Sequence, residues 1–209
     1  MGRRQEILTS KSLSATHDLL PEALSSTGSG RVIFLNGASS SGKSTIAHEL
    51  QGGMDGPWFH MAVDSFHRIR SRKDWTDEQF LPIFQRTVRG FHRAVAGLAA
   101  AGNDVVVDHI LGERWRLTDC LDVLADHHVV FVGVHCPLPE LEKRERERRD
   151  RQVGRAALQF PLVHAHGLYD VEVDTSRLTA AECAWRIKEH VDEGRPSSAF
   201  ENLRARQTR

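Results

Sequence analysis

A chain of 209 residues, with 40% hydrophobic and 27% charged residues, is long enough for one globular domain with a substantial core. Lys plus Arg and Asp plus Glu both number 28, and the resulting net charge of zero disfavours a general nucleic-acid-binding protein. No apolar run is long enough to span a membrane, no secretion signal is visible, and three widely separated cysteines favour reduced thiols in the cytoplasm.

The sequence pattern divides the chain into three parts. Residues 1–30 lack an apolar stripe and end in SSTGSG, so we expect a loosely attached, flexible extension. Residues 31–192 form the core domain, and from residue 193 a Gly-Arg-Pro break precedes a polar tail. The expected strands are residues 31–36, 58–64, 104–110, 128–136 and 169–176, and the expected helices begin near residues 43, 77, 113, 139 and 179. This alternation predicts an α/β domain whose parallel sheet is covered by helices on both faces.

A phosphate-binding loop is predicted between the first strand and the first helix. The stretch GASSSGKS fits the pattern G-x-x-x-x-G-K-[ST] in the strand–loop–helix context that the motif requires. Backbone N–H groups of such a loop curl around phosphates, and the helix N-terminus adds partial positive charge. Lys43 is expected to reach the β- and γ-phosphates of ATP, and the Ser44 hydroxyl to coordinate Mg²⁺. The expected nucleotide-binding residues are Gly37, Ala38, Ser39, Ser40, Ser41, Gly42, Lys43, Ser44 and Thr45.

Two aspartates lie at the ends of neighbouring predicted strands. Asp64 ends HMAVD, and Asp108 ends DVVVD. Ligands of open parallel sheets bind beyond the carboxyl ends of the strands, so both carboxylates should face the phosphate-binding loop. One could hold a water bound to Mg²⁺ and the other could accept the proton of an attacking hydroxyl. The alternative for each is an aspartate that caps the following turn.

A lid is predicted at about residues 140–160, where the sequence reads ELEKRERERRDRQVGR from residue 140. Glu–Arg pairs at spacing i, i+4, including Glu145 with Arg149, suit a solvated helix. Arg148, Arg151 and Arg155 remain in surplus near its end. They favour a lid that clamps the triphosphate, and the alternative is a helix whose charges only pair with one another.

Six segments together resemble the chloramphenicol phosphotransferase family, a group of small P-loop kinases. They cover most of residues 31–192 and read FLNGASSSGKS, AVDSF, VVVDHIL, VFVGVHCPLPELEKRE, DRQVG and YDVEVDTS with ECAWRI. The resemblance implies a nucleoside-monophosphate-kinase-like three-layer fold with five parallel strands in the order 2-3-1-4-5. It also implies ATP-dependent phosphorylation of a hydroxyl on a small molecule, which suggests antibiotic resistance.

The resemblance also implies roles for individual residues. The catalytic carboxylate of the family falls on Asp64, and its lid arginines fall approximately on Arg148 and Arg151. With Lys43, these are the expected catalytic residues. Mg²⁺ would then be held by Ser44 and, through water, by Asp108.

The acceptor region departs from what chloramphenicol requires. An aryl ring and a chlorinated acyl group would favour a largely apolar pocket. After Asp64, however, the sequence reads SFHRIRSRKDW, in which four basic residues lie close together. Two interpretations are equally open: a polar or anionic acceptor with Phe66 or Trp75 stacking against it, and an exposed basic loop. The expected acceptor-binding residues are Asp64, Ser65, Phe66, Arg68 and Trp75.

Two other functions fit the same fold. A kinase of a sugar acid or a nucleotide would differ from an antibiotic kinase only in its acceptor. A nucleotide-binding regulator would bind ATP without phosphorylating a small molecule, and the carboxylate at residue 64 counts against it. A switch GTPase is disfavoured because no N-K-x-D segment follows a later strand. Both a monomer and a homo-oligomer are compatible with the pattern.

Overall fold

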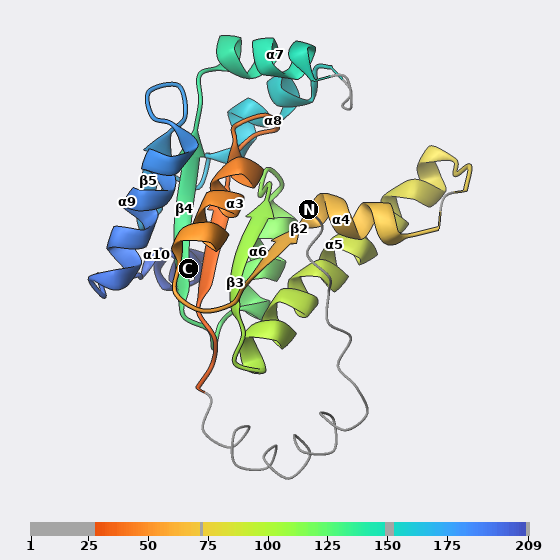
Figure 1. The fold of residues 1–209 in the computed structure, drawn as a ribbon. Coiled ribbons are helices and arrows are strands. Elements are labelled where there is room, and N and C mark those ends of the chain that lie inside the picture. The colour runs from red at the N-terminus through yellow and green to blue at the C-terminus, as the bar shows by residue number, and fades with distance from the viewer. Residues whose placement is uncertain (1–27, 72, 149–152, 208–209) are drawn as a thin grey trace, which may run out of the picture.

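The central feature of the computed structural model is a parallel sheet of five strands (Figure 1). The structure describes residues 28–71, 73–148 and 153–207, so residues 1–27 of the expected extension lie outside the described part. The strands are β1 (Val32–Asn36), β2 (Trp58–Ala62), β3 (Asp104–His109), β4 (Val129–His135) and β5 (Val171–Asp174). Their order is β2-β3-β1-β4-β5, which confirms the topology that the family resemblance implied.

Helices cover both faces of this sheet. One face carries α3 (Lys43–Gly53) and α9 (Ala180–Asp192), and the other carries α5 (Asp77–Ala100), α6 (Arg114–Val123) and α10 (Ala199–Gln207). The short α4 (Val63–Ile69) follows β2 directly, and α7 (Leu138–Glu147) and α8 (Arg155–Val163) lie beyond the carboxyl ends of the strands (Figure 1). In the described part of the chain, no helix is both long and apolar enough to cross a membrane.

The central strands are buried because each has a helix layer on either side. Every residue of β1 is buried, and Val32 pairs in register with Val105 of β3 and Val129 of β4. Successive side chains of a strand point to opposite faces. Val105 and Val107 therefore pack with the α5 side of the core, while Val106 packs with the α3 side. The sheet thus has one hydrophobic core on each face. Packing on both faces holds the strands in place, so that the carboxyl ends of β1, β2 and β3 lie at the same edge.

The C-terminal stretch differs from the polar tail that we expected. Helix α10 buries Ala199, Phe200 and Leu203 against the α5 side of the core. Its first turn is held by Asp170, whose Oδ1 accepts hydrogen bonds from the backbone N–H groups of Ser198 and Ala199. The stretch reads as a tail because only a few of its residues are apolar, and because its capping residue lies far away in the sequence.

Candidate active site

The phosphate-binding loop turns the chain from β1 into α3. Gly42, the residue before α3, has a φ of 93°, a left-handed conformation that favours glycine. A Cβ atom on Gly37 would lie 2.5 Å from the carbonyl oxygen of Val134 in β4. Both glycines of the motif are therefore required by the structure. Gly42 permits the left-handed backbone conformation, and Gly37 permits close approach to β4.

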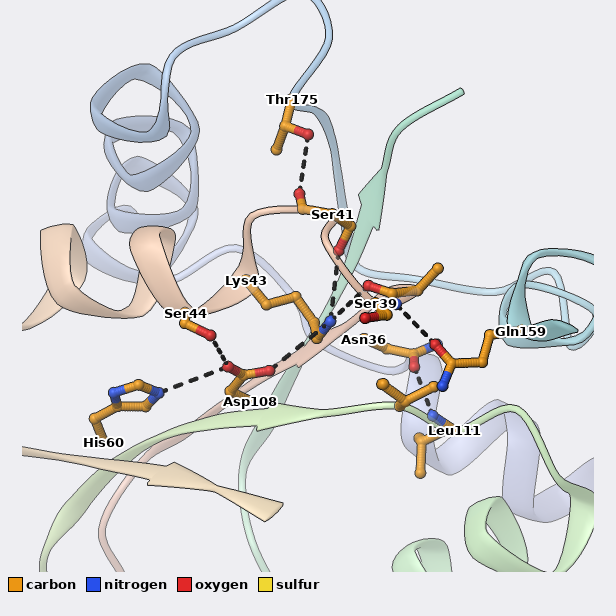
Figure 2. A network of polar contacts seen from close by, with 12 residues as sticks. Asn36, Ser39, Ser41, Lys43, Ser44, His60, Asp108, Leu111, Gln159 and Thr175 are labelled. Atoms are coloured by element: carbon orange, nitrogen blue, oxygen red, sulfur yellow. Dashed lines mark hydrogen bonds and ion pairs between the residues drawn. The ribbon is translucent and has the colours of Figure 1, made fainter. Parts of the chain in front are cut away.

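Lys43, Ser44 and Asp108 converge where this loop meets the carboxyl end of β3 (Figure 2). Ser44 Oγ donates a hydrogen bond of 2.5 Å to Asp108 Oδ2, and Lys43 Nζ lies 3.9 Å from Asp108 Oδ1. Lys43 Nζ also donates to the carbonyl oxygen of Ala38 at 2.9 Å. His60 Nε2 of β2 lies 3.9 Å from Asp108 Oδ2. The aspartate at the end of β3 thus faces the loop and contacts its lysine and serine.

Asp108 carries its negative charge in a nearly buried position. Burial alone would raise the pKa of this carboxyl group, but the charge of Lys43, together with His60 and Ser44, outweighs burial and leaves the pKa below its ordinary value. Asp108 is therefore ionised at neutral pH. An ionised carboxylate beside a hydroxyl offers the hard oxygen ligands that Mg²⁺ prefers.

A cavity of about 410 Å³ joins the loop to the junction of β2 and α4 and to the end of α7. Asp64 borders it from the first turn of α4, directly after β2 ends. Arg148 borders it from the lid side. The residues that were predicted from the sequence and that line this cavity are Ser40, Gly42, Lys43, Ser44, Asp64, Ser65, Arg68, Asp108 and Arg148. Residues that are distant in the sequence thus surround one space.

Two of the predicted acceptor-binding residues do not line this cavity, and one predicted lid arginine lies outside the described residues. Among the described residues, the lining of the cavity includes neither Phe66 nor Trp75. Phe66 packs against Phe91 of α5, with ring centroids 5.2 Å apart, and is half-buried against the core. Two residues after Asp64 on a helix, Phe66 lies on a different face of α4 from Asp64, and its stacking on the acceptor stays a prediction. Trp75 lies half-buried between α4 and α5, and Arg151 lies outside the described residues.

Contacts that the sequence did not predict tie the loop to its surroundings (Figure 2). The backbone N–H of Ser39 donates to Gln159 Oε1 of α8 at 2.8 Å, and Thr175 Oγ1 donates to the carbonyl oxygen of Ser41 at 2.9 Å. Arg144 of α7 donates to Oγ1 and to the carbonyl oxygen of Thr175, at 3.0 and 2.8 Å. The phosphate-binding loop is therefore connected to α7 and α8, the two helices of the predicted lid.

Glu145 joins the two lid helices. This side chain is 1% exposed, so it does not lie on the solvated face that we expected, and its expected partner Arg149 lies outside the described residues. Its Oε2 accepts from the backbone N–H of Gly154 at 2.8 Å, and its Oε1 accepts from that of Ala156 at 3.0 Å. The carboxylate thus caps the N-terminus of α8, where negative charge is favoured. The i, i+4 spacing alone could not show which face of α7 is buried.

Replacing Glu145 by Gln should weaken this cap. The amide keeps one acceptor oxygen but turns an N–H₂ group toward the second backbone donor. We expect the free energy of unfolding, measured with urea, to fall by about 1–3 kcal/mol. The control is Glu147→Gln on the same helix, where the side chain is exposed and the expected change is within about 0.5 kcal/mol. Equal losses in both variants would contradict the capping role.

The fold and the site together define the class of protein. A parallel sheet in the order 2-3-1-4-5, a phosphate-binding loop after β1 and helices beyond the sheet edge make this a P-loop protein with a kinase fold. Residues 30–192 match the protein family described as chloramphenicol phosphotransferase-like protein. The chain belongs to this family, which confirms the resemblance seen in the sequence.

A relative and several solved structures show how far this similarity extends. A Mycobacterium tuberculosis protein named putative O-phosphotransferase is 29% identical over 200 residues, which cover 85% of this chain and 89% of that protein. The structure of the M. tuberculosis APS kinase CysC in complex with AMPPNP and APS covers 78% of this chain and 98% of its own, with 17% identity and a TM-score of 0.60.

Two further structures share the fold. The Deinococcus radiodurans tunicamycin resistance protein covers 78% of this chain and 95% of its own, with 22% identity and a TM-score of 0.57. A gluconokinase from Sinorhizobium meliloti covers 86% of this chain and 95% of its own, with 17% identity and a TM-score of 0.53. At these identities the similarity establishes a common kinase fold.

Proposed function

We propose that this chain is an ATP-dependent O-phosphotransferase that transfers the γ-phosphate to a hydroxyl of a small molecule. One observation carries the proposal: Lys43 and Ser44 of the phosphate-binding loop share a single cavity with the carboxylate of Asp64. A nucleotide-binding regulator would need the loop and a carboxylate such as Asp108 beside it, but not a second carboxylate at the acceptor side of the cavity. Membership of the phosphotransferase-like family and the name of the M. tuberculosis relative support the same function.

The residues around the cavity suit each part of the reaction. The acceptor oxygen attacks the γ-phosphorus, the bond from that phosphorus to the β–γ bridging oxygen breaks, and ADP leaves. The hydroxyl proton passes to the carboxylate of Asp64. Lys43 and Arg148 offset the negative charge on the transferring group. Phosphoryl transfer usually has a loose transition state, so orientation and charge compensation should matter more than the strength of the base.

Ser44 and Asp108 fit the requirements of Mg²⁺. They offer a hydroxyl oxygen and an ionised carboxylate that lie 2.5 Å apart, and Mg²⁺ in nucleotide sites is commonly bound by one or two such groups plus phosphate oxygens. When bound, the ion neutralises charge on the β- and γ-phosphates. We propose that Ser44 contacts the ion directly and Asp108 through water.

The lining of the cavity favours a polar acceptor over chloramphenicol. Only Ala62, Val63 and Ile110 contribute apolar side chains among the described lining residues. A drug with an aryl ring and a chlorinated acyl group would need more apolar contact, and Phe66 of α4 packs against the core and is not among the lining residues. A role in antibiotic resistance therefore requires an antibiotic with a polar face next to its reactive hydroxyl.

The test is ATP consumption by the purified full chain with Mg²⁺, across a panel of hydroxylated antibiotics, chloramphenicol included, and hydroxylated metabolites. We expect at least one product whose mass increases by one phosphoryl group. ATP binding without a phosphorylated product from any acceptor would contradict the proposal and favour a nucleotide-binding regulator.

A further inference from the structure

Only part of the basic cluster after Asp64 reaches the cavity. Arg68 lines it, and its Nη2 donates to Ser65 Oγ at 2.9 Å. Arg70 turns to α5 instead: its Nη1 donates to Thr87 Oγ1 at 3.1 Å, and its guanidinium lies 5.8 Å from the centroid of the Phe80 ring. Among the described residues of the cluster, Arg68 is therefore the one that lines the acceptor end of the cavity. Any further cation near this end comes from another element.

Arg116 of α6 is such a cation, held beside the cavity wall. Its Nη1 donates to the carbonyl oxygen of Ile110, a lining residue, at 3.3 Å, and its guanidinium lies 4.8 Å from the centroid of the Phe84 ring. Its ion-pair partner is Glu113, with Nε at 2.6 Å from Oε2. The side chain of Arg116 is only 16% exposed, while that of Glu113 is 46% exposed and well solvated. Burial lowers the pKa of Arg116 despite this partner.

His67 lies three residues after Asp64 on α4, close to several of these charges. Its ring stacks on Phe84, with centroids 5.0 Å apart and an angle of 3° between the planes. Burial lowers the pKa of His67, and the charges of Arg70, Arg116 and Arg155 lower it further, while the charge of Asp64 raises it. One imidazole is thus within electrostatic range of Asp64 and of three guanidinium groups. Around this imidazole the charges of three guanidinium groups outnumber that of one carboxylate, a balance that an anionic acceptor would offset.

We propose that the acceptor is an anionic hydroxyl compound, whose carboxylate, sulfate or phosphate group binds to Arg68 and Arg116 while its hydroxyl faces Asp64. The inference rests on the proposed phosphotransferase function and adds the chemical class of the acceptor. A guanidinium group donates two parallel hydrogen bonds to a planar or tetrahedral oxyanion, so it fixes the orientation of the acceptor as well as its charge. Stacking of the Arg116 guanidinium on the Phe84 ring helps to hold it in place.

Pairs of acceptors that differ in charge test this directly. Initial rates are measured at saturating ATP with gluconate and sorbitol, glycerate and glycerol, and adenosine 5′-phosphate and adenosine. We expect the anionic member of at least one pair to have a kcat/KM about 10- to 100-fold above that of its neutral partner. The carboxylate and phosphate pairs distinguish which oxyanion is preferred. Phosphorylation of neutral members alone would overturn the inference and leave the phosphotransferase function intact.

Substitution of the two arginines shows whether they bind the acceptor or stabilise the transferring phosphoryl group. Arg116→Gln and Arg68→Gln should each raise the KM of the anionic acceptor about tenfold or more, with ATP affinity unchanged. The matched control is Arg114→Gln, an exposed arginine on the same helix, which should change neither. Equal losses on anionic and neutral acceptors would overturn the inference, because the arginines would then act on the phosphoryl group.

Calorimetric titration tests the anion site independently of the proposed phosphotransferase function. Each anionic probe is titrated into the full chain loaded with Mg²⁺ and a non-hydrolysable ATP analogue. Binding that Arg116→Gln weakens about tenfold supports the anion site even without turnover, and in that case the phosphotransferase function alone would fail. Absence of binding for all three anions would overturn the anion site.

Discussion

Lys43→Ala should lose both nucleotide affinity and phosphoryl transfer. Lys43 is 6% exposed, donates to the carbonyl oxygen of Ala38 and lies 3.9 Å from Asp108, so its ammonium group is fixed within the phosphate-binding loop. A lysine at this position reaches the β- and γ-phosphates and offsets charge that builds up during transfer. We expect kcat/KM to fall by about 10³-fold or more and the Kd of ATP to rise at least tenfold, as measured by single-turnover kinetics and titration.

Two further variants make the Lys43 result interpretable. Removing the buried ammonium leaves Asp108 with less charge compensation, so some loss of stability is expected. Lys43→Met retains most of the apolar stem and reduces the cavity that alanine would leave. Lys143→Ala, at an exposed position of α7, is the control for loss of a positive charge and should bind ATP normally. Unchanged ATP affinity in a folded Lys43→Met would contradict the assignment of the phosphate-binding loop.

The sequence predicted the sheet well because its strands are short, apolar and separated by clear helical patterns. All five expected strand segments contain an observed strand, and α3, α5, α6, α7 and α9 begin at or within one residue of the expected positions. The strand order came from the family resemblance, because alternation alone does not fix which strands pair. Helix α4 was missed because it continues β2 without a turn, and α10 because its cap, Asp170, is supplied from before β5.

Part of the candidate site was predictable because its residues follow directly from the positions of the strand ends. Residues next to a strand end, such as Asp64 and Asp108, follow from the rule that ligands bind at the carboxyl edge of the sheet. His60 could have been found in the same way, since it lies two residues before Ala62, which pairs with Asp108, and alternate residues share a face. Arg116 and Arg144 could not, because their roles depend on how helices pack around the cavity.

Asp64→Asn should remove most of the turnover while leaving ATP affinity nearly unchanged. Asparagine has the same shape but cannot accept the proton of the acceptor hydroxyl. We expect kcat to fall by about 10²- to 10⁴-fold, measured with whichever acceptor the panel identifies, and the Kd of ATP to stay within about twofold. Asp77→Asn is the matched control, since Asp77 also lies in the first turn of a helix but is exposed and does not line the cavity. It should retain full activity.

The outcome for Asp64 separates two roles that the geometry permits. If the carboxylate only orients the acceptor, asparagine can still hydrogen-bond to the hydroxyl, and the loss should be mainly a rise in the KM of the acceptor. If it accepts the proton as the bond to phosphorus forms, the loss should be in kcat and should not be recovered at saturating acceptor. Turnover close to that of the unmodified protein would contradict both roles. It would then be necessary to look for the base among the other groups that line the cavity, with His60 as the first candidate because its Nε2 lies beside Asp108.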